Sequence, residues 1–126
     1  MIVRELIGGE VVSIAPGATL ADAARRMKAN GIGSLAVEVG GTFEGIITER
    51  DILNACADDI DLDTAHVEEW MTPYPDTFGP DTSVEEAATW MTVAGYRHLP
   101  VLEDGVALGI VSIKDILWAL TVPTVI

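Results

Sequence analysis

The sequence predicts an α/β (α+β) fold made of two copies of one β-α-β-β-α unit, related by pseudo-twofold symmetry. A shift of 64 residues places residues 16–56 on residues 80–120 without a gap, and 14 of the 41 paired residues are identical. Both copies also show the same order of helical and extended hydrophobic patterns. Two copies form a closed pair and not a solenoid, so the two halves are expected to pack on each other.

The first copy opens with a predicted strand and a capped helix. Thr19 and Asp22 have the spacing of a capping box, apolar residues then recur at helical spacing, and Gly31 provides a stop. Two apolar runs follow, joined by Gly40 and Gly41, which suit a tight hairpin turn. The second run leads directly into another helix. The predicted strands are Val11–Ile14, Leu35–Val39 and Phe43–Ile47.

The second copy repeats this order. Ser83 and Glu86 stand at the expected helix start, Gly95 at its end, and Asp104 and Gly105 at the hairpin turn. A final helix again follows the last strand. The predicted strands are Asp76–Phe78, Leu99–Leu102 and Leu108–Val111.

The chain is expected to divide into a first repeat at 1–60, a linker with a lead-in helix at 61–74, and a second repeat at 75–126. The linker begins with aspartates and continues with a short amphipathic segment, Val67–Met71. Aspartates at 59, 61 and 63 are similar to the opening of a calcium loop, but Thr64 and Trp70 replace the Gly and Glu that this loop needs. No metal site is therefore expected.

The composition limits the compartment and the partners. A formal net charge of −13 repels phosphate backbones, which argues against nucleic acid as a partner. The longest apolar stretches are shorter than the roughly 18 to 20 residues that span a bilayer, and no secretory signal is recognisable. The single cysteine, Cys56, sits in an apolar helix pattern that predicts a buried, inert thiol. A cytoplasmic protein without a membrane partner is expected.

Catalysis is not expected. His66 and His98 are the only histidines, and neither has a partner at metal-binding spacing. Cys56 has no neighbouring base, and no Walker loop or Gly-x-Gly-x-x-Gly sequence follows a predicted strand. The sequence therefore predicts neither an enzyme nor a required cofactor.

The polar residues that both copies share gather where the last strand meets the last helix. Residues 45–51 align with residues 109–115 in the pattern Gly, two β-branched residues, a hydroxyl residue, two variable residues and Asp. Free N–H groups and the helix dipole attract phosphate at such a junction, and an Asp one turn into the helix can accept hydrogen bonds from ribose hydroxyls. The same spacing also forms a capping box without any ligand. From the residues alone, both interpretations stay open.

The doubled order of elements, with this signature in both copies, resembles a tandem pair of cystathionine-β-synthase (CBS) domains over nearly the whole chain. Tyr96–Val101 is similar to the second strand of such domains, and Trp70–Pro73 to the sequence that leads into one. The first copy has Gly33–Ser34 where the second has the basic pair Arg97–His98. The resemblance implies a regulatory Bateman module whose repeats pack sheet to sheet and leave two related clefts for adenosine-containing ligands.

The resemblance also implies which residues contact such a ligand. The hydroxyl and carboxylate of each signature would bind phosphate and ribose. The adenine ring would lie against the first strand of each half, with second-strand residues lining the walls. The implied ligand-binding residues are Thr48, Asp51, Ser112, Asp115, Val12, Ser13, Ile14, Asp76, Thr77, Phe78, Ala36 and Pro100.

The phosphates also need cations, and the chain has only seven Lys and Arg residues. Arg97 and His98 open a strand at the implied cleft, while Arg50 and Lys114 lie inside the signatures. Because neighbouring strand residues point to opposite faces, Arg97 and His98 share one ligand only if the strand starts after them. A solvated edge or a salt bridge is the alternative for either residue. The two clefts are expected to be unequal, since only the second copy has the basic pair.

The expected regulatory ligand is of the AMP, ADP or ATP class, with S-adenosylmethionine as the alternative in so acidic a protein. The chain carries no recognisable effector domain, so a stand-alone module is expected to signal by conformational change to an unidentified effector protein. Pairs of such domains often meet through their helices, which implies a homodimer. A ligand-free structural dimerisation module is the remaining alternative, with Trp70, Trp90 and Trp118 available for its interface.

Overall fold

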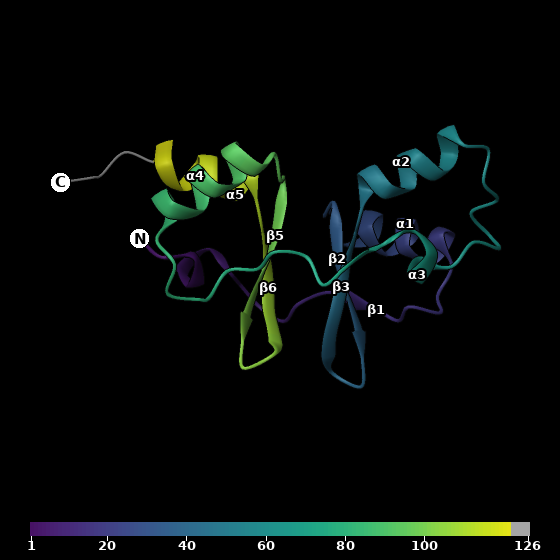
Figure 1. Ribbon diagram of the computed structural model, residues 1–126, viewed down its shortest axis with the longest axis horizontal. Helices are drawn as coiled ribbons and strands as arrows, with labels where there is room; N and C mark the ends of the chain where they lie inside the picture. The colour runs from purple at the N-terminus through teal and green to yellow at the C-terminus, as the bar shows by residue number, and fades with distance from the viewer. Residues whose placement is uncertain (122–126) are drawn as a thin grey trace. The chain divides into compact units, whose positions relative to one another are not determined.

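The computed structural model describes residues 1–121, and the chain divides into two compact units (Figure 1). The first unit is Val11–Pro75, and the second unit joins Met1–Glu10 to the chain from Asp76 onward. Residues 122–126, which end the predicted second repeat, lie outside the described residues. The first ten residues therefore belong with the second repeat and not with the repeat that they precede.

The first unit contains a four-stranded sheet and three helices. Its elements are β1 Ser13–Ile14, α1 Leu20–Asn30, β2 Ser34–Val39, β3 Thr42–Thr48, α2 Glu49–Ala57, α3 Val67–Trp70 and β4 Thr72–Pro73. The strand order is β1-β2-β3-β4, with β1 parallel to β2 and the other neighbours antiparallel. The β-α-β-β-α order predicted for this repeat is confirmed, although β1 has only two residues.

The second unit contains a β-hairpin and two longer helices. Its elements are η1 Val3–Leu6, a 3-10 helix, followed by α4 Val84–Ala94, β5 His98–Glu103, β6 Val106–Ser112 and α5 Ile113–Thr121. In Figure 1, α4 and α5 lie beside each other. The Ser83 hydroxyl caps α4 by accepting the Glu86 N–H at 3.0 Å, and Gly95 ends this helix in the left-handed region.

The prediction of a strand at Asp76–Phe78 is wrong, because only one bridge forms, between the last residue of this segment and Val101. In the first unit, the Ala36 N–H donates to the Val12 carbonyl oxygen at 3.1 Å. The residue aligned with Ala36 is Pro100, which has no N–H to donate. The second unit therefore lacks the bond that extends the ladder in the first.

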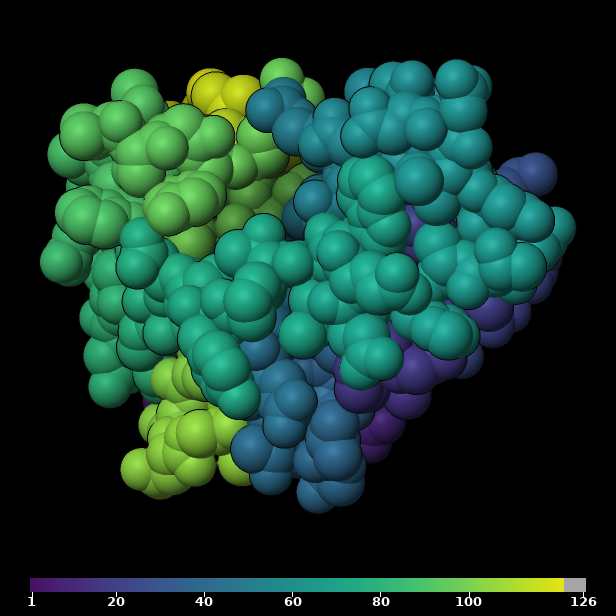
Figure 2. Space-filling view, turned by 45° about the vertical axis from the view of Figure 1, so that its right-hand side comes forward, coloured from purple at the N-terminus to yellow at the C-terminus, as the bar shows by residue number. Residues whose placement is uncertain are grey.

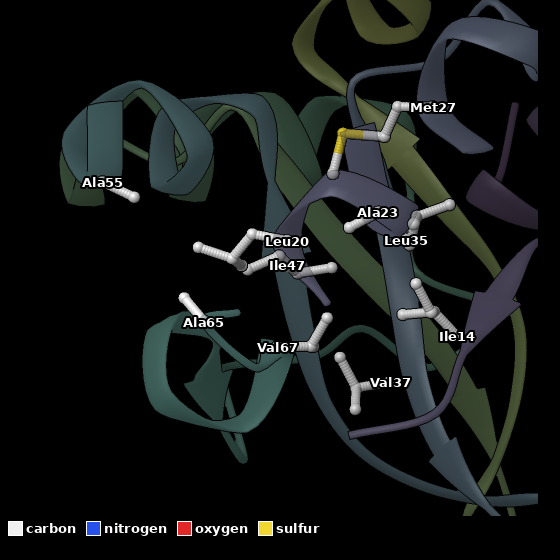
Figure 3. Packing of buried hydrophobic residues seen from close by; sticks show 10 residues of the cluster. All are labelled: Ile14, Leu20, Ala23, Met27, Leu35, Val37, Ile47, Ala55, Ala65 and Val67. Carbon is white, nitrogen blue, oxygen red and sulfur yellow. The ribbon is translucent and has the colours of Figure 1, made fainter. Parts of the chain in front are cut away.

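Each unit has a separate hydrophobic core made of aligned residues. Leu35 and Ile47, from β2 and β3, are fully buried among side chains of α1 and α3 (Figure 3). Their counterparts Leu99 and Val111, from β5 and β6, are each only 1% exposed in the second unit. The two copies thus build their cores at the same positions.

A short segment completes each core from outside the β-α-β-β-α repeat. Val3 in η1 and Val67 in α3 are aligned, and both are fully buried. The Val3 N–H donates to the Thr82 carbonyl oxygen at 2.8 Å, and the Val67 N–H donates to the Ala18 carbonyl oxygen at 2.8 Å. The segment that begins the chain therefore serves the second unit, and the segment between the repeats serves the first.

The two predicted hairpin turns are confirmed. Gly40 and Gly41 both have positive φ values, 57° and 81°, and Asp104 and Gly105 have 53° and 78°. Positive φ at both central residues is the property of the type I′ turn, which matches the twist of the flanking strands. The two tips form exposed ends, blue for the first unit and yellow-green for the second in Figure 2.

The prediction of a buried thiol is wrong, because Cys56 is exposed. On α2 the preceding residue, Ala55, points into the first core and is fully buried. One residue further along a helix is a rotation of about 100°, which turns Cys56 away from that core. The apolar run on α2 is thus only partly a core face, and Leu53 is 66% exposed.

The helices are short. Within the described residues the longest, α1 and α4, have 11 residues each. A span of the bilayer needs about 20 apolar residues. Within residues 1–121, no helix has the length and apolar character to cross a membrane.

Candidate functional site

Both signatures lie at a strand-to-helix junction, where the sequence predicts them. In the first unit, the Asp51 Oδ2 atom accepts the Thr48 N–H at 2.8 Å and the Thr48 hydroxyl at 3.1 Å. The Asp51 N–H donates back to the Thr48 Oγ1 atom at 3.4 Å. The hydroxyl and the carboxylate therefore form a capping box at the start of α2.

The second signature forms the same box at the start of α5. The Asp115 Oδ2 atom accepts the Ser112 N–H at 2.9 Å, and the Asp115 N–H donates to the Ser112 Oγ atom at 3.1 Å. Neither box requires a ligand. In both, however, the Oδ1 atom accepts no hydrogen bond from the described residues, so it can accept one from a bound molecule.

The glycine that opens each signature has a packing role. A Cβ atom on Gly45 would lie 2.7 Å from the Thr72 carbonyl oxygen, and one on Gly109 would lie 2.7 Å from the Ile7 Cγ2 atom. Ile7 follows η1, and Thr72 lies in β4, so the same kind of segment crosses both glycines. These glycines make room for the chain itself, and the sequence could not assign this contact to them.

The two signature carboxylates are half-buried. Burial raises the pKa of Asp51 above its ordinary value, and the two hydrogen bonds from Thr48 offset part of this effect. A raised pKa means that the fold places the charged form of this carboxylate in a less favourable environment than water. The first junction is therefore a costly place for negative charge.

Arg97 lies directly against the second signature. Its carbonyl oxygen accepts the N–H of Ile113, the first residue of α5, at 2.7 Å. Its side chain is exposed, and β5 begins at His98, so Arg97 precedes the strand. The strict alternation of strand faces therefore does not apply to Arg97, whose exposed side chain belongs to the residue that contacts the start of α5 through its backbone.

The first unit has the opposite charge at this place. Gly33, the counterpart of Arg97, accepts the Glu49 N–H on its carbonyl oxygen at 2.9 Å. A Cβ atom on Gly33 would lie 2.9 Å from the Glu49 Cδ atom, so the Glu49 carboxyl group covers this glycine. Where the second unit has the basic residue Arg97, the first unit thus has a glycine covered by a carboxyl group.

The other predicted residues fall into two groups. Arg50 and Lys114 are exposed in the first turns of α2 and α5, next to their signatures. Ala36 and Pro100 are buried on the neighbouring strands. Of the predicted residues Val12, Ser13 and Ile14, Ser13 accepts a hydrogen bond on its carbonyl oxygen from the Arg26 Nη1 atom at 2.6 Å, a contact that sequence reasoning missed.

Three further predicted residues line a hollow of about 340 Å³ in the second unit. Asp76, Thr77 and Phe78 form one wall. Three side chains of α4, which sequence reasoning did not select for a site, form the other: Glu86, Thr89 and Trp90. The Asp76 carboxylate accepts the Tyr96 hydroxyl at 3.0 Å, and this bond raises the pKa of the Tyr96 phenol. No residue of the second signature belongs to this lining.

Within residues 1–121, no group of three or more His, Cys, Asp or Glu side chains is arranged to hold a metal ion. Ionic contacts are exposed, such as Arg4 with Glu103 at 3.3 Å. The geometry that does recur is the pair of capped junctions.

Three comparisons with known proteins agree with this architecture. An uncharacterised 17.7 kDa protein of Acidianus ambivalens is 40% identical over 120 residues, which are 94% of this chain and 72% of that protein. A hexameric CBS-CP12 protein of bloom-forming cyanobacteria has a TM-score of 0.86 at 33% identity, covering 94% of this chain and 67% of that one. A CBS domain protein of Pyrobaculum aerophilum, in complex with AMP, has a TM-score of 0.85 at 28% identity, covering 95% of this chain and 98% of that one.

The family assignment follows from the chain itself and from these relatives. Residues 3–58 and 67–122 each match the family described as CBS domain. The two matched stretches include η1 and α3, the two segments that complete the cores. The chain belongs to the CBS domain family and carries two copies of the domain.

Proposed function

We propose that the chain is a regulatory module in which the second signature binds an adenosine-containing ligand of the AMP, ADP or ATP class. The observation that carries this proposal is the placement of Arg97 beside a capped helix start whose Asp115 retains a free Oδ1 atom. A cation, a helix N-terminus and a carboxylate acceptor match the phosphate and ribose of a nucleotide.

Each group has a distinct role in this proposal. Arg97 and the first N–H groups of α5 bind the phosphate, with Lys114 adding charge at the same end. The Ser112 hydroxyl donates to a phosphate oxygen while its oxygen keeps the cap. Asp115 accepts the ribose hydroxyls through Oδ1. The AMP complex of the Pyrobaculum aerophilum relative supports this ligand class.

The first signature is proposed to bind phosphate weakly or not at all. Glu49 places a carboxylate over Gly33, the residue that aligns with Arg97 in the second unit. A phosphate there would meet the like charge of the exposed Glu49 carboxylate. The sulfonium cation of S-adenosylmethionine would meet an opposite charge, which makes this compound the second candidate ligand, specifically for the first unit.

The output of the module is proposed to be a conformational change read by a separate effector protein. A ligand shifts such an equilibrium only by its difference in affinity for the two states, typically about 1 to 3 kcal/mol. The ligand acts as a regulator in this proposal, and no residue described above is assigned a catalytic role.

A homodimer is proposed on the basis of the outer faces of α4 and α5. Val93, Leu117, Trp118 and Leu120 are 79%, 56%, 59% and 48% exposed. Apolar side chains gathered on neighbouring helices favour association. Light scattering during gel filtration should give a molar mass of twice the chain mass for the wild-type protein. Trp118→Lys should reduce this molar mass to that of one chain. A monomeric wild-type protein would contradict the proposal.

The ligand proposal is tested by a thermal-shift panel with AMP, ADP, ATP with and without magnesium, NAD, S-adenosylmethionine and cyclic dinucleotides. A ligand at about 100 times its Kd should stabilise the protein by roughly 2.7 kcal/mol. Asp115→Ala should abolish the shift with AMP. The matched control is Ser83→Ala, which removes the cap of α4 at a comparable cost of about 1 kcal/mol and should leave the shift intact.

The contradicting results are equally specific. If no compound raises the melting temperature, the signatures are helix caps only, and the ligand-free structural dimerisation module becomes the better interpretation. If AMP still stabilises the Asp115→Ala variant to the full extent, the ligand binds elsewhere on the chain.

A further inference from the structure

The hollow beside α4 in the second unit has acidic and aromatic walls. Asp76 and Glu86 contribute two carboxylates, and Phe78 and Trp90 contribute two aromatic side chains. Trp90 is 46% exposed, so part of its ring surface faces solvent. The Thr89 hydroxyl donates to the Glu85 carbonyl oxygen at 3.0 Å and retains its own acceptor capacity. Among residues 1–121, no cationic residue lines the hollow.

The aligned place in the first unit carries two cations of the chain itself. Arg26, aligned with Trp90, donates from Nη1 to the Ser13 carbonyl oxygen at 2.6 Å. Ser13 is aligned with Thr77, so this guanidinium lies against the segment that corresponds to the wall of the hollow. Arg25, aligned with Thr89, forms a 2.7 Å ion pair with Asp22, which is aligned with Glu86.

The two copies carry different charges at this place in the fold. The first unit has two guanidinium groups there and one carboxylate, Asp22. The second unit keeps an acid at that position, Glu86, and gains another, Asp76, where the first unit has Val12. Both arginines are replaced, one by Thr89 and one by Trp90. The second unit therefore keeps the acceptors and has lost the cations that occupy them in the first.

We propose that this hollow binds the guanidinium group of a small organic cation, in the position that Arg26 occupies in the first unit. A planar guanidinium pairs with carboxylates through several N–H donors and stacks on an aromatic ring. Glu86 and Asp76 supply the acceptors, and Trp90 supplies the ring. The high negative charge of the chain raises the local concentration of such a cation.

This site is separate from the proposed nucleotide site and does not depend on it. None of its lining residues belongs to the second signature, and Arg97 does not line it. Asp76, Thr77 and Phe78 were also expected to lie near an adenine ring, so the experiment must separate the two ligands.

The test is a titration of the full chain with L-argininamide. Binding is monitored in NMR spectra through the indole N–H signals of the three tryptophans. L-citrullinamide is the matched neutral compound, since it replaces guanidinium by urea. The Trp90 signal, assigned with the Trp90→Phe variant, should shift in a saturable way with argininamide and not with citrullinamide. Glu86→Gln should weaken binding about tenfold, as expected for the loss of a charged acceptor.

Two variants provide the controls. Glu85→Gln removes a neighbouring exposed carboxylate that does not line the hollow, and it should leave binding unchanged. Trp90→Arg should fill the hollow with the chain's own guanidinium, as in the first unit, and abolish binding while the remaining spectrum stays folded.

The proposal would be overturned by the absence of a saturable shift at Trp90, by equal binding of citrullinamide, or by equal weakening by Glu85→Gln and Glu86→Gln. Displacement of argininamide by AMP would also overturn it, because the hollow would then belong to the nucleotide site. Binding of argininamide that AMP leaves unchanged supports it, whatever the outcome for AMP itself.

Discussion

The first and second units share a scaffold and differ in the surfaces around it. Aligned residues form both cores, both capping boxes and both hairpin turns. Around this scaffold, the second unit has Arg97, Ile113 and Trp90 at the positions where the first unit has Gly33, Glu49 and Arg26. The residues that the two copies share therefore maintain the fold. The residues that differ give aligned sites on the two units different charges.

The largest expected effect tests whether the two cores are equivalent. Leu35→Ala and Leu99→Ala each remove a fully buried side chain from an aligned position. Each should lower the free energy of unfolding by about 2 to 5 kcal/mol, from lost burial and the cavity left behind. Urea unfolding measures both. A cost below about 1 kcal/mol for only one of them would break the equivalence.

The next effect tests the segments that complete the cores. Val3→Ala and Val67→Ala should each cost about 2 kcal/mol, since two buried methyl groups are lost. Hydrogen exchange of backbone amides shows which unit is affected. Val3→Ala should raise exchange in β5 and β6, and Val67→Ala in β2 and β3. The reverse pattern would contradict the assignment of η1 to the second unit.

A smaller effect tests the caps. Thr48→Ala and Ser112→Ala remove the side-chain acceptor at the starts of α2 and α5. Each should cost about 1 kcal/mol in thermal unfolding without ligand. A neutral result for either would show that its capping box contributes nothing to stability, and the signature would then need a ligand to explain it.

The smallest effect concerns Asp51. Because burial raises its pKa in the fold above the unfolded value of 3.8, its contribution to stability is present below that value and is lost as the pH rises through the raised pKa. The ionised form therefore destabilises the fold at neutral pH. Asp51→Asn should gain stability relative to the wild-type protein between about pH 3 and about pH 7 in urea unfolding. A flat or falling difference would contradict the burial effect.

Much of this architecture could be predicted from the sequence, because the repeat pairs hydrophobic and turn residues at a fixed shift. The loss of the strand at Asp76–Phe78 could not be predicted from hydrophobicity, since it depends on a missing N–H at Pro100 on a neighbouring strand. The packing of η1 on the core of the second unit depends on tertiary contacts. A signal existed, because Val3 and Glu5 align with Val67 and Glu69, but it does not say which core receives the valine.

The position of the two signatures at strand-to-helix junctions could be predicted from the sequence, and the charges around them could not. The signature spacing identifies Thr48, Asp51, Ser112 and Asp115. The carboxyl group of Glu49 over Gly33 depends on how the strand and the helix meet, and no local pattern indicates it. The hollow beside α4 depends in the same way on side chains from two separate segments.

The most direct test of the difference between the units is a calorimetric titration of the chain with AMP. A single tight site is expected. Arg97→Gly, which gives the second unit the residue of the first, should weaken binding about tenfold or more, as for loss of a charged hydrogen bond. Lys28→Ala, which removes an exposed cation at the end of α1, should leave it unchanged. Two equal sites, or full affinity in Arg97→Gly, would contradict the account.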